Sequence, residues 1–539
     1  MADAIVLVGL SGSGKSSVGR LIAERLGRPF IDLDADIERR EGAAPARLIT
    51  ELGEAHFRGL EATAVQQAAA VDSAVIATGG GAVIDPLNRW ALWRAGTVLW
   101  LDAREEVLAS RLAAHAETRP LLAGDVETKL RELLEQRLPF YRAADQRIDG
   151  AARQRTVADA VIAAVEEGPR SARRFFDAEV RRDHLMGPPL ARVVLGSDLA
   201  AGTLDAIIRP ISSGDPLVVA DRRAAAALPR LMQALPAERR LLIATGEHHK
   251  RLRTVERLLE AASAMGAERG DAWVGVGGGT ATDMVGAAAA LYLRGVPFVA
   301  LPTTWLGMTD AAIGGKVGVD LSAAKNAAGA FWPPVGIVAD VATLHTLPRA
   351  RRLDGMAESL KSGLIGDVAL WHLVEMRGRA ALRGDGAARY AAIDRSVRLK
   401  LGVVERDPFE HGERRNLNLG HTLGHALEVE SRYRLAHGQA VVLGIRAVAA
   451  MAHRRGAEPD LVERIDSVVS SLGYVLQRDF DAAAVKAALR TDKKRHQGRQ
   501  RWILPMAVGH TQEVDDVTDV ELDAALSIIS AGRPMGLAS

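Results

Sequence analysis

Residues 9–16 form a phosphate-binding pattern near the start of the chain. An apolar run at 5–8 leads into the spacing G-x-x-x-x-G-K-S, and a helical pattern follows over 17–26. In such a loop the backbone N–H groups cradle a polyphosphate at the N-terminus of the new helix. Lys15 can reach the β- and γ-phosphates, and the Ser16 hydroxyl can ligate Mg²⁺. The pattern predicts a nucleotide site but names neither acceptor nor reaction.

Two carboxylates stand where an acceptor could be oriented. Asp32 and Asp34 come at the end of an expected strand over 30–33. At a strand end that faces the phosphate loop, one carboxylate can lie near the Mg²⁺ and the other can accept a hydrogen bond from a substrate hydroxyl. A helix cap formed by Asp34 or Asp36 is the alternative interpretation.

Arginines and glycines complete this first set. Arg58, Arg119 and Arg137 are the residue types that stabilise transition-state charge and clamp a carboxylate. Three glycines at 79–81 follow an expected strand over 74–77, which indicates close backbone approach to a ligand. Phosphoryl transfer to a small anionic acceptor needs such a combination.

Together these residues resemble shikimate kinase, over about residues 3–165. The resemblance implies ATP-dependent phosphorylation of shikimate with Mg²⁺; a gluconate-type kinase shares the phosphate loop but not the arginine set. Asp34 would orient or deprotonate the attacking hydroxyl, and Lys15 and Arg119 would stabilise the transferring group. The implied contacts are Gly12, Ser13, Gly14, Lys15, Ser16, Ser17, Arg111 and Arg119 for ATP, Asp34, Arg58, Gly80 and Arg137 for shikimate, and Ser16 and Asp32 for Mg²⁺.

Histidines and a glutamate in the last third of the chain have the types and spacing of a metal site. His421 and His425 lie at i, i+4 on one face of an expected helix, His437 follows, and Glu358 and Lys361 stand one turn apart upstream. The chain has no cysteine, so a catalytic Zn²⁺ would take His and Glu ligands. Spacing alone favours His421 and His425 as the ligand pair.

A glycine run at 277–279 lies between an expected strand over 272–276 and a helix. It does not fit the G-x-G-x-x-G dinucleotide pattern, but an open backbone at a helix start still suits a pyrophosphate. Hydroxyls at Thr303 and Thr304 follow the next expected strand, and Asp310 and two lysines come after them. The run alone is weak support for a nucleotide site.

Residues from about 190 to 515 resemble 3-dehydroquinate synthase. The resemblance rests on many motifs in order, among them G-E-x-x-K at 246–250, P-T-T at 302–304, M-A-E-x-x-K at 356–361, the run at 418–425 and D-K-K at 492–494. It implies conversion of 3-deoxy-D-arabino-heptulosonate 7-phosphate to 3-dehydroquinate and phosphate, with NAD⁺ regenerated in each cycle. Zn²⁺ or Co²⁺ would polarise the hydroxyl that is oxidised.

The resemblance also changes the metal assignment: Glu358, His421 and His437 become the ligands, and His425 a supporting or proton-transfer residue. The implied NAD⁺ contacts are Glu247, Lys250, Gly278, Gly279, Thr280, Asp283, Thr303, Thr304, Asp310, Lys316, Lys325, Thr346 and Leu347. The implied substrate and catalytic residues are Lys316, Lys361, Lys400, Arg414, Asn418 and His425, with Arg294, Asn326, and Lys493 or Lys494 for the heptulosonate phosphate.

Four features depart from the family pattern, one of them being that the acidic residue usual near Pro348 is missing. Thr282 and Ala324 stand where glycine is usual, and Gln439 stands where glutamate is usual. None removes an implied ligand or charged contact. Ala324 stands beside a cofactor lysine and so bears on nucleotide affinity, and Gln439 could alter the surroundings of the metal.

The elements that must position these residues fit an α/β chain of several domains. With 539 residues, one core is not expected. Further strands are expected over 97–101, 192–195, 216–220, 241–244, 298–301 and 336–339. We predict a parallel-sheet P-loop domain of the nucleoside-monophosphate-kinase type at 1–168, a basic, poorly periodic linker at 169–190, a Rossmann-like NAD domain at 191–345 and an all-helical metal-binding domain at 346–539.

Composition sets the remaining expectations. A net charge of +2 gives no field that would attract nucleic acid or a membrane, and no signal peptide or membrane span is found, so a cytoplasmic enzyme is expected. The resemblance implies a homodimer through the synthase half. The sequence therefore predicts a fused shikimate kinase and 3-dehydroquinate synthase. The alternatives are a kinase joined to a different sugar-phosphate cyclase, or to a degenerate noncatalytic scaffold.

Overall fold

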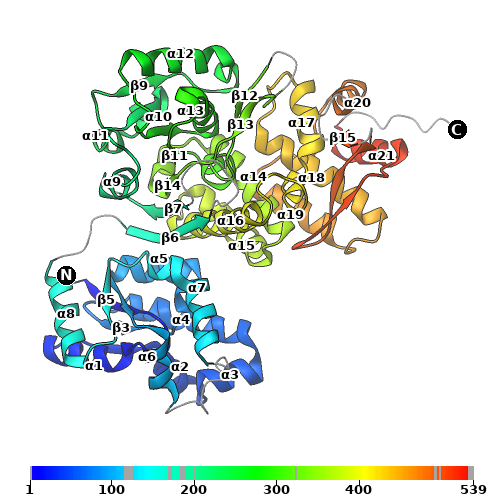
Figure 1. Ribbon diagram of the computed structural model, residues 1–539. Helices are drawn as coiled ribbons and strands as arrows, with labels where there is room; N and C mark the ends of the chain where they lie inside the picture. The colour runs from blue at the N-terminus through cyan, green and yellow to red at the C-terminus, as the bar shows by residue number, and fades with distance from the viewer. Residues whose placement is uncertain are drawn as a thin grey trace. The chain divides into compact units, whose positions relative to one another are not determined.

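The computed structural model describes residues 3–113, 126–167, 173–181, 190–199, 201–321, 325–490, 495–496 and 499–531. The chain divides into two compact units (Figure 1). The first comprises residues 1–179 and 192–204, and the second comprises 180–191 and 205–539. Among the described residues, no helix is both long enough and apolar enough to cross a bilayer.

The first unit is built on a five-stranded parallel sheet of order β2-β3-β1-β4-β5. Its strands are β1 (Ala4–Val8), β2 (Phe30–Asp32), β3 (Val75–Ala77), β4 (Gly96–Asp102) and β5 (Gln146–Asp149). Its helices are α1 (Lys15–Leu26), α2 (Leu33–Glu41), α3 (Pro45–Leu52), α4 (Glu54–Ala69), α5 (Pro86–Ala95), α6 (Glu105–Ala113), α7 (Val126–Tyr141) and α8 (Gln154–Glu166), with the short turn η1 (Ala82–Ile84).

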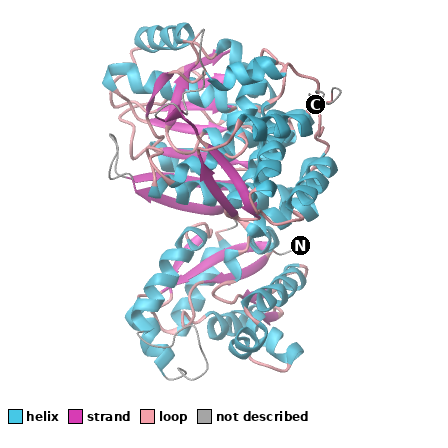
Figure 2. Ribbon diagram, turned by 90° about the vertical axis from the view of Figure 1, so that its right-hand side faces the viewer, coloured by secondary structure: helices cyan, strands magenta, loops and turns pink. Residues whose placement is uncertain are grey.

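Helices lie on both faces of this sheet (Figure 2), as the burial of its central strand β1 requires. Every one of its residues is buried, as in the continuous apolar runs of parallel sheets that helices cover on two sides. Ile5 and Leu7 pack with α1 and α8. The loops after β1, β2 and β3 leave the same edge of the sheet, because parallel strands share their carboxyl end. This edge therefore gathers the residues predicted to bind nucleotide and acceptor.

The larger sheet has seven strands in the order β6-β7-β14-β11-β10-β8-β9. They are β6 (Arg173–Arg181), β7 (Leu190–Ser197), β8 (Leu217–Asp221), β9 (Arg240–Ile243), β10 (Trp273–Gly277), β11 (Phe298–Pro302) and β14 (Gly336–Asp340). The pairs β9–β8, β8–β10, β10–β11 and β11–β14 are parallel. The accompanying helices are α9 (Ala201–Ile208), α10 (Arg222–Ala227), α11 (Pro229–Gln233), α12 (Leu252–Ala264) and α13 (Gly279–Leu291).

Short elements lie between the strands and helices of this part of the chain. They are η4 (Glu247–His249), η5 (Tyr292–Arg294), η6 (Gly307–Ala311), η7 (Val341–His345), η8 (Glu413–Asn418) and the antiparallel pair β12 (Lys316–Val319) and β13 (Ala328–Phe331). The helices are α14 (Arg349–Ile365), α15 (Val368–Arg383), α16 (Gly386–Arg406), α17 (His421–Glu430), α18 (His437–Arg454), α19 (Leu461–Leu472), α20 (Ala482–Arg490) and α21 (Asp519–Ile529).

The predicted fold class is confirmed, with two local differences. The region predicted as all-helical also contains β15 (Arg495–His496), β16 (Arg499–Gln500) and the antiparallel hairpin of β17 (Trp502–Ala507) and β18 (His510–Val514). The segment predicted as a linker contains β6, which corrects that prediction for residues 173–181. There Phe175 and Phe176 are buried, and Arg174 and Arg192 both bond to the buried Asp177, so the basic residues neutralise a carboxylate.

Glycines allow an unusually close approach of α17 and α18. Gly420 is the N-cap of α17 and has the left-handed φ of +75°. A methyl group on it would lie 2.7 Å from the Val441 carbonyl oxygen. A methyl group on Gly444 would overlap the Gly420 carbonyl oxygen, and one on Gly424 would lie 3.1 Å from the Ala440 carbonyl oxygen. The two helix backbones therefore touch where no side chain fits.

We predict that Gly444→Ala separates these helices and destabilises the second unit by roughly 1–3 kcal/mol, as overpacking does. Its thermal unfolding midpoint should fall by several degrees. Gly402→Ala in α16 is the matched control, because its new methyl would meet only the end of the Arg406 side chain. Circular dichroism of the full chain during heating measures both. Equal midpoints for the two variants would contradict the close packing described.

Candidate active sites

The loop after β1 wraps around the ammonium group of Lys15. Gly9, Gly12 and Gly14 have φ of +143°, +84° and +94°, a backbone region that side chains with a Cβ rarely adopt. Lys15 is 8% exposed, and its Nζ donates to the carbonyl oxygens of Gly9 at 2.9 Å and Leu10 at 2.8 Å. Ser16 is exposed in the first turn of α1. The loop holds a cation and a helix N-terminus at one point, as a polyphosphate requires.

The glycine turn after β3 brings the predicted acceptor residues together. A methyl group on Gly79 would lie 2.7 Å from Asp34 Oδ1, and one on Gly80 would lie 3.0 Å from Arg137 Nη1. A methyl on Gly81 would overlap the Arg58 guanidinium. Asp34, Arg58 and Arg137 therefore converge on one bare stretch of backbone. A carboxylate and two guanidinium groups there can bind a hydroxyl and an anion.

Two further residues support this cluster that the sequence analysis did not identify. Glu61 is 2% exposed, and its Oε2 lies 2.7 Å from Arg58 Nη1. Burial raises the pKa of Glu61, and the Arg58 guanidinium opposes that shift. Tyr141 donates from its hydroxyl to the Gly80 carbonyl oxygen at 2.8 Å, and burial raises its pKa to about 12. The i, i+3 spacing of Arg58 and Glu61 on α4 was the available signal.

Asp32 and Arg111, two other predicted residues of the first unit, both bond to backbone groups. Asp32 Oδ1 accepts from the Ala35 backbone N–H at 3.3 Å, so Asp32 is the N-cap of α2. The alternative interpretation had assigned this cap to Asp34 or Asp36. Arg111 lies beside the phosphate loop, where its Nη1 donates to the carbonyl oxygens of Gly12 at 3.3 Å and Gly150 at 2.9 Å. Arg119 lies outside the described residues.

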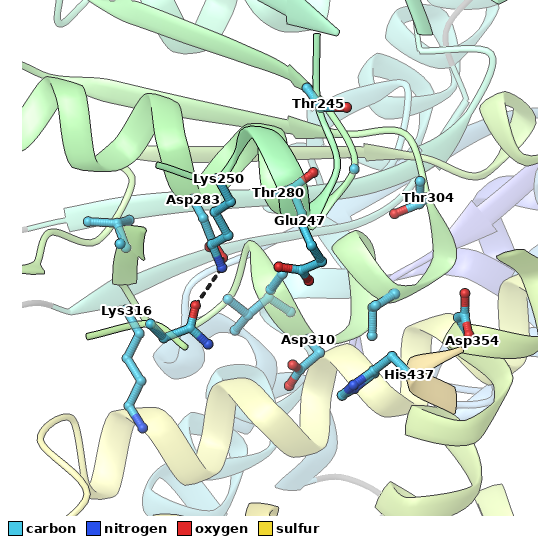
Figure 3. A pocket seen from close by; sticks show the side chains of 18 of the residues that line it. Thr245, Glu247, Lys250, Thr280, Asp283, Thr304, Asp310, Lys316, Asp354 and His437 are labelled. Atoms are coloured by element: carbon cyan, nitrogen blue, oxygen red, sulfur yellow. Dashed lines mark hydrogen bonds and ion pairs between the residues drawn. The ribbon is translucent and has the colours of Figure 1, made fainter. Parts of the chain in front are cut away.

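The second unit contains a cavity of about 900 Å³ (Figure 3). Every residue predicted to contact NAD⁺ lines it. On one side Lys250 Nζ lies 2.5 Å from Asp283 Oδ2 and 2.6 Å from Asn326 Oδ1. Burial alone would lower the pKa of Lys250, but the Asp283 carboxylate outweighs it and raises the pKa. On this wall the glycine N-terminus of α13 lies in the same cavity as the fixed Lys250 ammonium group. Such a combination can bind the pyrophosphate of a dinucleotide.

Cationic side chains line another part of the cavity. Lys316, Lys400 and Arg414 are among them; Lys400 Nζ lies 2.5 Å from Asp310 Oδ1, and Arg414 donates to the Gly314 carbonyl oxygen at 2.9 Å. Burial lowers the pKa of Lys400 despite Asp310. Glu410, which was not predicted, pairs with Lys316 and accepts from Asn418 Nδ2 at 2.8 Å. This cationic lining can bind a phosphate ester.

Three helices deliver one candidate metal site. Glu358 lies in α14, and His421 and His437 are the first residues of α17 and α18. Glu358 Oε1 lies 3.5 Å from His421 Nε2 and 3.3 Å from His437 Nε2. Burial alone would lower the pKa of His437, but Glu358 and Glu428 raise it to about 10. Lys361 pairs with the same Glu358 carboxylate from one turn further along α14. The two imidazoles and the one buried carboxylate fit a divalent metal.

A second group of potential metal ligands shares one histidine with the first. His425, Glu428 and His437 offer atoms within 4.8 Å of one another. His425 lines the cavity, and its ring centre lies 5.3 Å from that of His421. Spacing alone favours His421 and His425 as a pair, but within the described residues each of them belongs to a different group of potential ligands. The set implied by the resemblance, Glu358, His421 and His437, is grouped.

Some predicted residues lie away from the cavity or cannot be placed. Arg294 is exposed in η5 and is not part of the lining. Lys493, Lys494 and Ala324 lie outside the described residues. Gln439 exchanges hydrogen bonds with the Val475 backbone at 2.8 and 3.0 Å, so its side chain is engaged away from the metal ligands.

Comparisons with known proteins match both halves. Family models match for shikimate kinase over residues 11–166, for the N-terminal part of 3-dehydroquinate synthase over 240–354 and for its C-terminal part over 355–495. A 3-dehydroquinate synthase of Xanthomonas campestris pv. campestris is 39% identical over 323 residues, 58% of this chain and 86% of that protein.

A solved structure that resembles the second half and a curated relative that matches nearly the whole chain are informative. The structure is ValA, a 2-epi-5-epi-valiolone synthase of Streptomyces hygroscopicus with NAD⁺ and Zn²⁺ bound, at TM-score 0.58 and 30% identity, covering 64% of this chain and 98% of that one. The bifunctional shikimate kinase/3-dehydroquinate synthase of Thermotoga maritima is 33% identical over 528 residues, 96% of this chain and 98% of that protein. The chain therefore belongs to the bifunctional shikimate kinase/3-dehydroquinate synthase family.

Proposed function

We propose that the residues assembled in the two units carry out the two activities of the family at separate sites. One site phosphorylates shikimate with ATP. The other converts 3-deoxy-D-arabino-heptulosonate 7-phosphate to 3-dehydroquinate and phosphate. The observation that carries the proposal is the grouping of Glu358, His421 and His437 beside a cavity that all the predicted NAD⁺ contacts line.

At the kinase site, Lys15 would exchange its carbonyl partners for the phosphates of ATP, and Ser16 would hold Mg²⁺. Mg²⁺ supplies charge neutralisation on the phosphates. Asp34 would orient or deprotonate the attacking hydroxyl, because it faces the glycine turn at 79–81. Arg58 and Arg137 would bind the shikimate carboxylate, with Glu61 holding Arg58 in place. Asp32 would assist Mg²⁺ only from its capping position.

At the synthase site, Glu358, His421 and His437 would hold Zn²⁺ or Co²⁺. The metal supplies polarisation of the substrate hydroxyl, and NAD⁺ supplies a hydride acceptor. Lys316, Lys400 and Arg414 would bind the phosphate ester. His425 would move a proton, since it lines the cavity next to His421. By family likeness, we also propose a homodimer formed through this half.

A different cyclase activity is the second candidate, because ValA is similar to this half and has NAD⁺ and Zn²⁺ bound. Such an enzyme would share the nucleotide and metal residues and differ in its product. A noncatalytic scaffold is less well supported, since the ligand group and the cationic lining are complete among the described residues of the cavity.

Lys15→Met should abolish shikimate phosphorylation and leave cyclase activity unchanged. Loss of one transition-state charge contact typically costs about 10²–10³-fold in rate. Arg25→Met is the matched control in α1, because Arg25 pairs with Asp159 at 2.5 Å and lies in the last turn of the helix, whereas the loop precedes its first turn. Steady-state assays of both activities on each variant provide the measurement. Loss of both activities in Lys15→Met would contradict two independent sites.

Glu358→Gln should remove most of the bound zinc and most cyclase activity, because the amide lacks the charge that holds the metal. We expect at least about a 100-fold fall in activity, as removal of a transition-state contact produces. Glu405→Gln, at an exposed position of α16, is the control. Metal content by mass spectrometry and cyclase assays report the outcome. If both stay at the level of the control, the metal assignment is wrong.

A further inference from the structure

Glu428 is a buried carboxylate behind the candidate metal ligands that no part of the mechanism above uses. It is 3% exposed and does not line the cavity. It lies seven residues after His421 and three after His425, so all three share one face of α17. Its position means that it can act on the reaction only through another residue.

One such residue is His437. Glu428 Oε1 lies 3.5 Å from His437 Nδ1, while the other ring nitrogen, Nε2, lies 3.3 Å from Glu358 Oε1. Nε2 is therefore the nitrogen available to a metal. A carboxylate at Nδ1 favours the imidazole tautomer that carries its proton on Nδ1. It also makes the unprotonated Nε2 a stronger electron-pair donor to a metal.

His421 is held by a different kind of acceptor. Its Nδ1 lies 3.2 Å from the Leu419 carbonyl oxygen, and its Nε2 faces Glu358. Both ligand histidines thus turn Nε2 toward the same carboxylate. Behind His437 stands a carboxylate, and behind His421 stands a backbone carbonyl, so the two supports differ in kind.

The same oxygen of Glu428 also faces the nucleotide side of the cavity. Lys325 Nζ lies 3.3 Å from Glu428 Oε1 and 3.4 Å from Glu247 Oε1, and it sits 5.0 Å from the Tyr433 ring centre. Lys325 and Glu247 both line the cavity. Glu428 therefore contacts a nucleotide-side lysine and a metal ligand at once.

We propose that Glu428 is a positioning residue that orients His437 for metal binding and links it to Lys325. This proposal rests on the proposed function, because it assumes that His437 is a metal ligand. It excludes a role limited to neutralising Lys325, which would stabilise the fold without affecting metal affinity. It also excludes direct coordination by Glu428 in the alternative group with His425.

The test compares Glu428→Gln with Glu430→Gln in the full chain. Glu430 lies on the same helix, and it accepts from the Asp481 backbone N–H at 3.2 Å. Each chain is stripped of metal, and Zn²⁺ affinity is measured by competition with a chromogenic chelator. We expect Glu428→Gln to bind Zn²⁺ about 10–100-fold more weakly, the usual effect of removing a group behind a metal-bound histidine. Glu430→Gln should bind as the unaltered chain does.

Two further readouts separate positioning from folding. The visible absorption bands of the Co²⁺-loaded chain should shift in Glu428→Gln, because His437 is reoriented. The gain in unfolding temperature upon Zn²⁺ addition should shrink, since stabilisation follows affinity. A variant that is merely less stable would lose unfolding temperature with and without Zn²⁺ equally.

The outcomes distinguish this proposal from the one it rests on. Unchanged affinity and an unchanged Co²⁺ spectrum in Glu428→Gln would overturn the positioning role alone. Metal loss as complete as in Glu358→Gln would also overturn it, because Glu428 would then be a ligand. Failure of the unaltered chain to bind Zn²⁺ would overturn the metal assignment itself.

Discussion

The contact between the backbones of α17 and α18 is the constraint on which the candidate metal site depends. Gly420, Gly424 and Gly444 let the two helices meet without side chains between them. His421 and His437 begin these helices, so the contact fixes the separation of the two imidazoles. Glu358 then needs only to reach this pair from α14. Two histidines sixteen positions apart become one site through small residues that carry no chemistry.

Charge is arranged in a similar way around the cavity. Buried lysines have carboxylate partners, as Lys250 has Asp283 and Lys400 has Asp310. A buried cation needs such a partner, because the cost of removing it from water is otherwise large. The pairs keep cations at the cavity wall, where a phosphate or pyrophosphate can use them. The phosphate loop of the first unit applies the same rule, with backbone carbonyl oxygens around Lys15.

Local patterns in the sequence predicted much of this structure. The apolar runs predicted most strands of the two large sheets, although β5 and β6 were not among them. The phosphate loop lies at the end of β1, as its spacing indicates. Spacing carries less information where candidate ligands come from separate helices, as Glu358, His421 and His437 do. It favoured His421 with His425, and only the family resemblance selected His437, because helix periodicity says nothing of which helices meet.

Residues that act from behind were also missed for a physical reason. Glu61 and Glu428 are buried, and their roles depend on the side chains that they contact. Those contacts result from the packing of the helices, which the sequence pattern does not reveal. Conversely, the suspected effect of Gln439 has no support, since its side chain bonds the Val475 backbone. The strand β6 was not predicted, because a run of arginines is typical of a solvated linker. In the structure, arginines of this region pair with the buried Asp177.

Identification of the products made by the purified chain tests the central claim most directly. The full chain is incubated with shikimate, ATP and Mg²⁺, and with 3-deoxy-D-arabino-heptulosonate 7-phosphate, NAD⁺ and Zn²⁺, and the products are assigned by nuclear magnetic resonance. Two active sites of the kind described predict shikimate 3-phosphate and 3-dehydroquinate from the same protein. A different cyclic product, or no 3-dehydroquinate beside active kinase, would contradict the account of the second site.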